Sequence, residues 1–355
     1  MKKVAIIGIQ GVPANYGGFE TLVENLIGEY HSPNIEYTVF CSSKDMPSKP
    51  KEHKGAKLKY IPLHANGLQS ILYDIVAMIR SIRGYDALLI LGVSGCIFLP
   101  FVKLLCKGKI IVNIDGLEHR RDKWSRIARK FLLLSEVFAV RFAHTIITDN
   151  KGISEYVKWR YRRKTKLITY GGDHVTKVSA PEREQEVLKQ YGLKKGEYIM
   201  SLCRIEPENN CHITLEAVEK TNQQLVFVGN WNRNEYSRKL KEKYKDNSNI
   251  VLLESIYDLE ILHILRNNAR CYIHGHSAGG TNPSLVEAMF FGRPILAYDV
   301  IYNRETTYGK ALYYSNSQEL IEYLKQDSLP CDDLRQVADR RYTWKSIIRE
   351  YEQLY

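Results

Sequence analysis

Cysteine is scarce in this chain and is never arranged for cross-linking or metal binding. The 355 residues include seven cysteines, with no C-x-x-C pair and no spacing typical of a zinc site. This excludes a disulfide framework and a structural zinc module as the basis of the fold. The pattern favours reduced thiols, so we expect a cytoplasmic protein.

Long apolar runs are missing as well. The apolar part of Met1–Gly8 is too short for a signal peptide and is followed at once by Gly11 and Pro13, so we predict a first strand there. The longest uncharged apolar run, Ala87–Val102, is interrupted by glycines and by Pro100. It predicts a strand, a loop and a helix start rather than a membrane span. Solenoid-like repeats and low-complexity tracts are also absent.

Acidic residues are few in the first half of the chain. Up to Gly172 there are 27 Lys and Arg against 14 Asp and Glu, whereas the remainder has 24 against 26. A basic half predicts an anionic partner, either nucleic acid or the inner leaflet of a membrane, unless it is a solvated basic face. Nucleic acid is disfavoured because the tyrosines are spread over both halves and no module that reads nucleic acid is present.

Short apolar runs alternate with helical patterns along the chain. Strands are predicted at Lys3–Ile9, Tyr37–Cys41, Leu58–Leu63, Ala87–Val93, Lys109–Ile114, Thr145–Thr148, Lys166–Thr169, Tyr198–Cys203, Leu225–Val228, Ile250–Leu253, Cys271–His274 and Ile295–Tyr298. Helices are predicted at Phe19–Tyr30, Gln69–Ile82, Trp124–Phe142, Cys211–Thr221, Glu235–Lys245, Leu259–Asn267, Ser284–Phe291 and Tyr342–Tyr355. Such alternation is typical of parallel, doubly wound α/β sheets. The pattern restarts after Thr176–Glu186, which we predict to be a linker between two facing Rossmann-like domains with a cleft between them.

A Gly-rich turn in the second half carries the strongest indication of a ligand site. Gly279–Met289 follows a predicted strand and begins a predicted helix. Backbone N–H groups at a helix start are suited to holding phosphates. The Glu287 carboxylate can accept hydrogen bonds from sugar hydroxyls, so the combination predicts a nucleotide-sugar site.

The first loop of the chain is also rich in glycine. Within Gly8–Thr21, Gly17 and Gly18 would let the backbone approach a phosphate or a sugar closely. The spacing is not G-x-G-x-x-G in register, which disfavours a dinucleotide site. A purely structural turn is an equal alternative.

Charged side chains gather at two other predicted strand ends. Asp115 and Glu118 lie in Asn113–Arg121, at the carboxyl end of a strand, where α/β sites form; a solvated turn is the alternative. Arg204 follows the first strand of the second half and is suited to a diphosphate through bidentate hydrogen bonds. A neighbour such as Asn209 could instead cap the next helix.

Together these motifs resemble retaining nucleotide-sugar glycosyltransferases of glycosyltransferase family 4, over essentially the whole chain. The marks of the resemblance are Tyr16–Glu20, Tyr170–Asp173, Arg204–Asn210, Glu287–Pro294 and Tyr342–Trp344. Gly11–Thr21 and His274–Ser284 are similar to a subgroup associated with rhamnosyl transfer in bacterial surface-polysaccharide assembly. The resemblance implies the GT-B fold, with domains over residues 1–172 and 173–335 and a C-terminal helix over 336–355 that packs toward the N-terminal domain.

The resemblance also implies roles for particular residues. Gly17 and Gly18 would approach the donor diphosphate, which Arg204 binds, and Glu287 would bind the ribose hydroxyls. The residues implied at the reaction centre are Asp115, Glu118 and Arg204. The further donor-binding residues implied are Asn209, Ser255, Ile256, His276, Gly280, Thr281, Asn282, Ser284 and Leu285. Among these, the backbone near Ser255 would read the base, and amides near Ser284 would meet the distal phosphate.

Two positions depart from the family pattern. Relatives often carry a Lys where this chain has Asn209, so one positive charge at the diphosphate must come from elsewhere. They also carry a Glu where this chain has Gly279. Without that carboxylate, glucose-type donors are disfavoured and a 6-deoxyhexose such as rhamnose is compatible, with Thr281 or Asn282 replacing the contact.

The implied reaction is sugar transfer with retention to a saccharide or lipid-linked saccharide. The best candidate donor is dTDP-rhamnose, with UDP- and GDP-sugars as alternatives. A front-face route, in which a diphosphate oxygen takes the acceptor proton, ranks above double displacement through Asp115. No D-x-D motif lies in the expected cleft segments, so we expect no metal and no other cofactor. A non-catalytic nucleotide-sugar-binding protein is the remaining alternative, although Asp115, Arg204 and Glu287 together speak against it.

Two features are left open by these patterns. His274 and His276 could touch the donor or only satisfy their loop, and they lack the partners of a metal site. Lys123–Leu134 joins basic residues to an apolar face and could dock on an anionic leaflet. A core helix would also account for residues such as Leu134, with the arginines left at the membrane, so we expect peripheral attachment to the inner face of the cell membrane.

Overall fold

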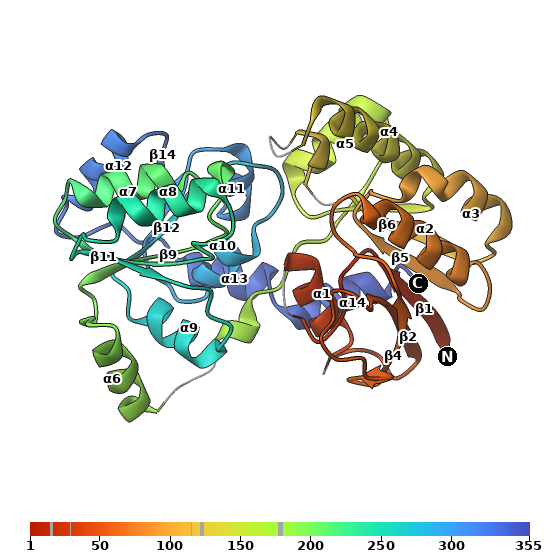
Figure 1. The fold of residues 1–355 in the computed structure, drawn as a ribbon, viewed down its shortest axis with the longest axis horizontal. Helices are drawn as coiled ribbons and strands as arrows, with labels where there is room; N and C mark the ends of the chain where they lie inside the picture. The colour runs from red at the N-terminus through yellow and green to blue at the C-terminus, as the bar shows by residue number, and fades with distance from the viewer. Residues whose placement is uncertain (15–16, 29, 115, 121–123, 177–179) are drawn as a thin grey trace. The chain divides into compact units, whose positions relative to one another are not determined.

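The chain folds into two compact α/β units (Figure 1). The computed structural model describes residues 1–14, 17–28, 30–114, 116–120, 124–176 and 180–355. Unit 1 comprises Met1–Tyr170 together with Trp344–Tyr355, and unit 2 comprises Gly171–Thr343. Each unit is built on its own mostly parallel sheet, which confirms the predicted two-domain α/β fold.

Unit 1 has an eight-stranded sheet in the order β3-β4-β2-β1-β5-β6-β7-β8. Its strands are β1 (Lys2–Ile7), β2 (Ile35–Ser42), β3 (Glu52–His53), β4 (Ala56–Ile61), β5 (Ala87–Leu91), β6 (Lys109–Asn113), β7 (Thr145–Thr148) and β8 (Lys166–Leu167). All neighbouring strands pair in parallel except β3 and β4. The central strand β5 is apolar and buried throughout, as expected for a strand whose two faces are covered by helices.

The helices of unit 1 form two layers. They are α1 (Gly18–Leu26), α2 (Gln69–Ser81), α3 (Leu99–Leu105), α4 (Arg126–Phe142), α5 (Lys151–Tyr161) and α14 (Trp344–Glu352). The chain moves through β5, β6, β7 and β8 in one direction along the sheet, so right-handed crossovers place α3, α4 and α5 on one face. α2 lies on that face too, whereas α1 packs on α14 on the other (Figure 1).

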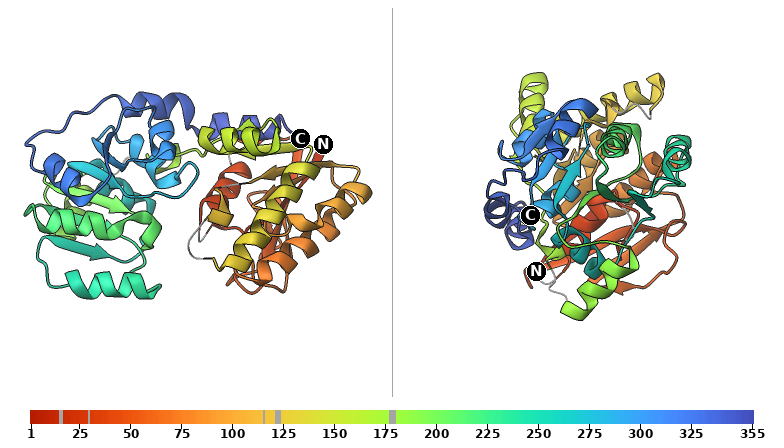
Figure 2. Two further views of the ribbon diagram at one scale, coloured as in Figure 1. Left: turned by 90° about the horizontal axis from the view of Figure 1, so that it is seen from above. Right: turned by 90° about the vertical axis from the view of Figure 1, so that its left-hand side faces the viewer.

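The C-terminal helix α14 completes the core of unit 1. Its residues Trp344, Ile347, Ile348 and Tyr351 recur at helical spacing, are all buried, and join the apolar cluster formed by β1 and α1. The Lys2 Nζ atom donates a hydrogen bond to the backbone carbonyl of the last residue at 2.6 Å. The two ends of the chain therefore lie side by side in unit 1 (Figure 2).

Unit 2 has a six-stranded parallel sheet in the order β11-β10-β9-β12-β13-β14. Its strands are β9 (Tyr198–Leu202), β10 (Gln224–Val228), β11 (Ile250–Leu253), β12 (Cys271–His274), β13 (Ile295–Tyr298) and β14 (Leu312–Tyr314). Its helices are α6 (Pro181–Gln190), α7 (Cys211–Glu219), α8 (Glu235–Tyr244), α9 (Leu259–Asn267), α10 (Pro283–Met289), α11 (Ile301–Thr306), α12 (Ser317–Leu324) and α13 (Leu334–Arg341). Two apolar clusters, one on each face, form its core.

Every predicted strand is present, but two local predictions are wrong. The stretch Thr176–Glu186 is not wholly a linker, because α6 begins at Pro181, with proline and acidic residues in its first turn as helix starts favour. Leu134 does not pack on the sheet, because it lies on the outer side of α4 and is 45% exposed. Phe131 and Phe138 are partly buried, as a core-facing helix requires.

Candidate functional site

The carboxyl edge of the unit 2 sheet brings together the loops that follow β9 and β12, which are neighbouring strands. The Asn210 Nδ2 atom donates to the carbonyl of Gly275 at 2.9 Å, and the Ser277 hydroxyl donates to the carbonyl of Glu208 at 2.9 Å. A Cβ atom on Gly275 would lie 2.2 Å from the carbonyl oxygen of Asn209. The glycine therefore permits the close approach that ties the two loops.

Arg204 begins the loop after β9 and rests on a buried support. Its guanidinium is partly exposed, with Nη2 3.9 Å from Oε1 of Glu208. Beneath it, the buried Asn209 donates from Nδ2 to the carbonyl of Arg204 at 2.7 Å, and its Oδ1 lies 2.7 Å from Nδ1 of His276. Since Oδ1 can only accept, the proton is on His276 Nδ1. Asn209 thus bridges the two loops from inside the protein.

His274 is a neutral, buried side chain at the end of β12. Burial lowers its pKa to about 3, so it carries no charge at neutral pH. Its ring stacks on Tyr272, with centroids 6.3 Å apart. Within the described part of the chain, its Nε2 atom has no hydrogen-bond partner. The ring of His276 lies 6.2 Å away.

The start of α10 is capped by the protein itself. The Asn282 Oδ1 atom accepts from the backbone N–H of Ser284 at 3.0 Å and from its hydroxyl at 2.8 Å. The N–H of Leu285 donates to the carbonyl of Asn282 at 3.1 Å. The amides that the sequence assigns to the distal phosphate are therefore engaged in this structure. Gly280 has a φ of +84° and Thr281 is buried, so the preceding turn is tightly packed.

Glu287 lies on α10 and is paired with a buried arginine. One of its oxygens accepts a hydrogen bond from Nη2 of Arg266, on α9, and the other lies 3.6 Å from Nε2 of His174. The Arg266 side chain is only 1% exposed, against 14% for Glu287. Among the described residues, nothing accepts from Nε or Nη1 of Arg266. Arg266 is not among the predicted site residues, since no local motif links positions 21 residues apart.

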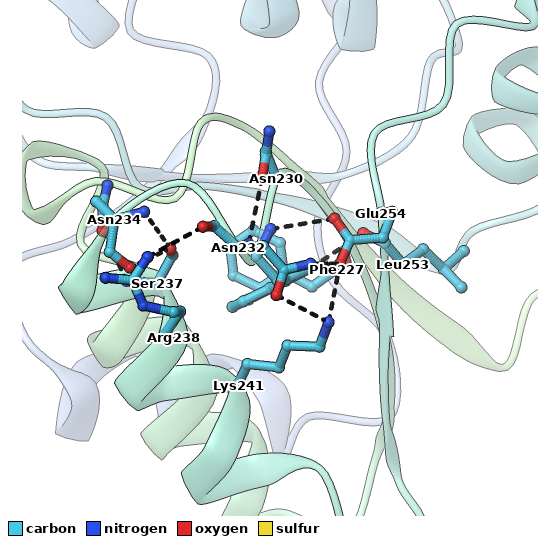
Figure 3. Close-up of polar contacts among 10 residues, drawn as sticks. Phe227, Asn230, Asn232, Asn234, Ser237, Arg238, Lys241, Leu253 and Glu254 are labelled. Atoms are coloured by element: carbon cyan, nitrogen blue, oxygen red, sulfur yellow. Dashed lines mark hydrogen bonds and ion pairs between the residues drawn. The ribbon is translucent and has the colours of Figure 1, made fainter.

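The loop after β10 also reaches this edge of the sheet and is not among the sequence predictions (Figure 3). It spans Gly229–Asn234 and is anchored by the buried Trp231, whose Nε1 donates to the carbonyl of Leu253 at 3.0 Å. Glu254 accepts from the side chain of Asn232 at 2.8 Å and from Nζ of Lys241 at 2.9 Å. The Asn234 Nδ2 atom donates to the carbonyl of Ile205 at 3.1 Å, so the loop is held between the segments that follow β9 and β11.

The predicted base-reading residues follow β11, at the edge of the sheet. Ser255 is exposed, and Ile256 is partly buried against the core of unit 2. They lie on the same carboxyl edge as Arg204, with β10 between β11 and β9.

In unit 1, the predicted glycine loop leads into α1. Gly17 precedes the helix with a φ of +91°, and Gly18 is its first residue. A Cβ atom on Gly17 would lie 2.5 Å from Oε2 of Glu20. The other oxygen of Glu20 accepts from the backbone N–H of Gln10 at 3.0 Å. The motif therefore closes its own loop, and the positive φ of Gly17 favours glycine at this position.

The second predicted site in unit 1 follows β6. Asp115 lies outside the described residues. Glu118 begins a short 3₁₀ turn, Glu118–Arg120, and its Oε2 accepts from Nε1 of Trp124 at 3.0 Å. This contact holds the carboxylate against its own loop.

A buried carboxylate on α4 supports this turn. Glu136 lies 2.9 Å from Nδ1 of His119 and accepts from the hydroxyls of Tyr156 at 2.9 Å and Tyr161 at 2.6 Å. Burial alone would raise the pKa of Glu136, but the hydrogen bonds from His119 and the tyrosines outweigh it and lower the pKa. An ionised Glu136 therefore joins α4, α5 and the turn after β6.

Comparisons with known proteins agree with this division of the chain. Residues 1–173 match a family described as a domain of unknown function, DUF1972. Residues 183–326 match the family described as Glycosyl transferases group 1. No curated protein matches the chain.

Solved structures match both units at once. Sucrose-phosphate synthase from Thermosynechococcus elongatus has a TM-score of 0.82 and 16% identity, covering 100% of this chain and 98% of its own. HepE from Anabaena, in complex with UDP and glucose, has a TM-score of 0.77 and 15% identity over 99% of each chain. The catalytic domain of starch synthase IV from Arabidopsis thaliana, bound to ADP and acarbose, has a TM-score of 0.70 and 13% identity, covering 100% and 98%. The chain therefore has the two-domain GT-B fold, and the group 1 glycosyltransferase match over residues 183–326 supports glycosyltransferase activity.

Proposed function

We propose that the chain transfers a sugar from a nucleoside-diphosphate donor to an acceptor hydroxyl, with retention, as family 4 glycosyltransferases do. The observation that carries the proposal is the pair Arg204 and Glu287 in unit 2, within the part that matches group 1 glycosyltransferases. Structural relatives support a nucleotide donor, since HepE is solved with UDP-glucose and starch synthase IV with ADP.

Within this proposal, the donor is dTDP-rhamnose and the acceptor is a saccharide or lipid-linked saccharide of a bacterial surface polysaccharide. Gly279 supports the 6-deoxy sugar because it offers no carboxylate to a gluco-type hydroxyl. A UDP- or GDP-sugar would leave the enzyme class unchanged. A protein that binds nucleotide sugars or nucleic acid without turnover is the alternative from another class.

The chemistry follows from the charge that develops on the leaving diphosphate. Arg204 would stabilise that charge through its guanidinium, and Asn209 holds the backbone from which Arg204 extends. A fixed cation that needs no reorganisation during the reaction lowers the barrier more than a mobile one. Glu287 would hold the ribose through its carboxylate, and Gly17 and Gly18 would admit the diphosphate from unit 1. Asp115 would orient the sugar or stabilise its oxocarbenium character, and no metal takes part.

Binding of nucleotide sugars tests the proposal directly. Thermal unfolding is followed with dTDP-rhamnose, UDP-glucose, UDP-N-acetylglucosamine, GDP-mannose and the bare nucleotides. A ligand at 100 times its Kd stabilises the folded state by about 2.7 kcal/mol. We expect dTDP-rhamnose to raise Tm in the wild type and in Arg238→Ala, an exposed control on α8, but not in Arg204→Ala. Stabilisation by another sugar nucleotide would reject the rhamnose assignment, and no stabilisation by any would reject the donor site.

Turnover distinguishes an enzyme from a binding protein. We expect release of the bare nucleotide and a new glycoside whose anomeric configuration, read by NMR, matches that of the donor. Activity should survive EDTA. Binding without nucleotide release would favour the non-catalytic alternative, and an activity lost in EDTA and restored by Mg²⁺ or Mn²⁺ would reject the metal-free route.

A further inference from the structure

The net positive charge of the chain arises from one part of unit 1. Residues 99–166 contain 17 Lys and Arg against 6 Asp and Glu, a net charge of +11. The whole chain has the same net charge, so all other residues together are neutral. This segment contains α3, α4 and α5, which share one face of the sheet, with α4 in contact with both of the others (Figure 1).

The outer side of α3 is apolar although it faces solvent. Leu99 and Val102 are buried beneath the helix, whereas Phe101, Leu104 and Leu105 are between 59% and 82% exposed. Residues spaced by three and four lie on one side of a helix, so these three form a single apolar face. No acidic residue occurs in α3.

The neighbouring helix α4, which contacts α3, also exposes apolar side chains. Ile127 is 82% exposed, and Leu134 is exposed two turns further on. Arg126 and Lys130 are exposed on the same helix, while its acidic residue, Glu136, is buried inside the unit. We call the exposed residues of the two helices and the following lysine the α3–α4 patch; its members are Phe101, Lys103, Leu104, Leu105, Lys107, Arg126, Ile127, Lys130 and Leu134.

The residue composition of the patch indicates which kind of partner it binds. Single-stranded nucleic acid is bound by cations interleaved with stacking aromatic rings, whereas this patch has one aromatic, Phe101, among aliphatic side chains. Protein interfaces are depleted of lysine at their centre. Aliphatic side chains surrounded by Lys and Arg are the composition of surfaces that lie in the headgroup region of an anionic bilayer. No helix among the described residues has the length and apolar character needed to cross that bilayer.

We propose that the α3–α4 patch docks unit 1 on the surface of a bilayer that contains anionic lipids. Leu104, Leu105 and Ile127 enter the boundary between headgroups and acyl chains, and the lysine and arginine side chains meet the headgroup phosphates. This inference rests on the proposed lipid-linked acceptor, whose sugar is presented at such a surface. It replaces the single basic helix suggested by the sequence with a surface shared by two helices.

Vesicle flotation of the full chain tests the proposal. Vesicles of phosphatidylcholine with and without phosphatidylglycerol are compared at low and high salt. Each cation near an anionic surface contributes about fivefold in affinity, so the triple variant Lys107→Gln, Arg126→Gln, Lys130→Gln should lose roughly 100-fold. The double variant Leu104→Ser, Ile127→Ser should lose roughly 100-fold, because each of the two aliphatic side chains contributes about 1.5 kcal/mol when it leaves water.

Matched variants in unit 2 provide the control. The triple variant Lys194→Gln, Lys220→Gln, Lys239→Gln removes the same charge from exposed positions, and Ile301→Ser removes an exposed isoleucine. Both should bind vesicles like the wild type, and all variants should keep the wild-type Tm.

Several results would overturn the proposal. Equal binding to neutral vesicles would rule out an electrostatic contribution to docking. Patch variants that float like the wild type would show that the α3–α4 patch does not contact the bilayer. If the wild type binds a 20-nucleotide single-stranded nucleic acid but not vesicles, and the patch variants lose that binding, the patch binds nucleic acid instead. Sugar transfer to a soluble acceptor, measured without vesicles, tests the proposed function separately. A variant that no longer docks on vesicles should keep that activity.

Discussion

The buried ion pair between Arg266 and Glu287 predicts that an alanine substitution at Glu287 lowers stability as well as donor binding. In Glu287→Ala, the guanidinium of Arg266, which is 1% exposed, loses its carboxylate partner. Removing one member of a buried pair costs roughly 3–5 kcal/mol, because the other charge stays buried. Glu287 itself is 14% exposed, so water screens part of the pair and we expect about 3 kcal/mol.

The assay is calorimetric unfolding at pH 7 together with urea titration. For a unit the size of Gly171–Thr343, each kcal/mol shifts Tm by about 2–4 °C, so Glu287→Ala should lower Tm by roughly 6–12 °C. Adding Arg266→Met should recover most of the loss, because two apolar residues replace a buried ion pair almost neutrally. The exposed pair of Glu235 and Lys239 is the control, and Glu235→Ala should lower Tm much less, because exposed ion pairs contribute little to stability.

Two results would refute this reasoning. A Tm of Glu287→Ala within 2 °C of the wild type would show that Arg266 does not depend on that carboxylate. A double variant no more stable than the single one would show that the two side chains are not coupled. If both expectations hold, the proposed role of Glu287 in donor binding is better tested with Glu287→Gln, which keeps an acceptor oxygen beside Arg266.

Three other predictions concern the Gly17 turn, the buried Asp74 and the C-terminal helix α14. Gly17→Ala places a Cβ 2.5 Å from Oε2 of Glu20 at a φ of +91°, so we expect about 1–3 kcal/mol of strain and a lower kcat/KM for the donor; an unchanged kcat/KM would contradict this. Burial raises the pKa of Asp74 to about 8. Between about pH 4 and 8 the folded protein therefore keeps a proton on Asp74 that the unfolded chain has released. The free energy of unfolding should therefore fall between pH 4 and 8, by up to roughly 1.4 kcal/mol per pH unit. In urea titrations Asp74→Asn should reduce that slope, and an unchanged slope would show that Asp74 is ionised in the fold. Deleting Trp344–Tyr355 removes four buried side chains of α14, each contributing about 1.5–3 kcal/mol. Circular dichroism should show unit 1 unfolded, and a truncated chain with the wild-type Tm would contradict the packing of α14.

The sheets could be predicted because their central strands are apolar on both faces. Cys271–His274 forms β12 with the predicted bounds, since all four residues are buried. The short edge strand β14 could not be predicted, because three residues become a strand only when β13 pairs with them. The start of α6 could not be predicted, because the segment is acidic and the helix buries only Val187 and Leu188.

Candidate site residues could be proposed from the sequence only where they belong to a local motif. Arg204 and Glu287 lie in such motifs, and the structure places both in unit 2. Arg266 could not be found in this way, because its role depends on α9 packing beside α10 rather than on its sequence neighbours. The same holds for Glu136, which supports the turn after β6 from a helix that begins well after it.

The bridge made by Asn209 bears on how a donor diphosphate would be neutralised. The family resemblance leads one to expect a lysine at this position, yet Asn209 is buried and both ends of its amide are used, one by Arg204 and the other by His276. A lysine could not make both contacts, because it has donors but no acceptor for His276 Nδ1. Compared with the family pattern, the chain therefore has one fewer cation at this position, but Asn209 ties the Arg204 backbone to the loop that follows β12. A positioned charge stabilises a developing anion without reorganising. In the proposed donor complex we therefore expect diphosphate stabilisation to depend most on Arg204, whose backbone this bridge holds.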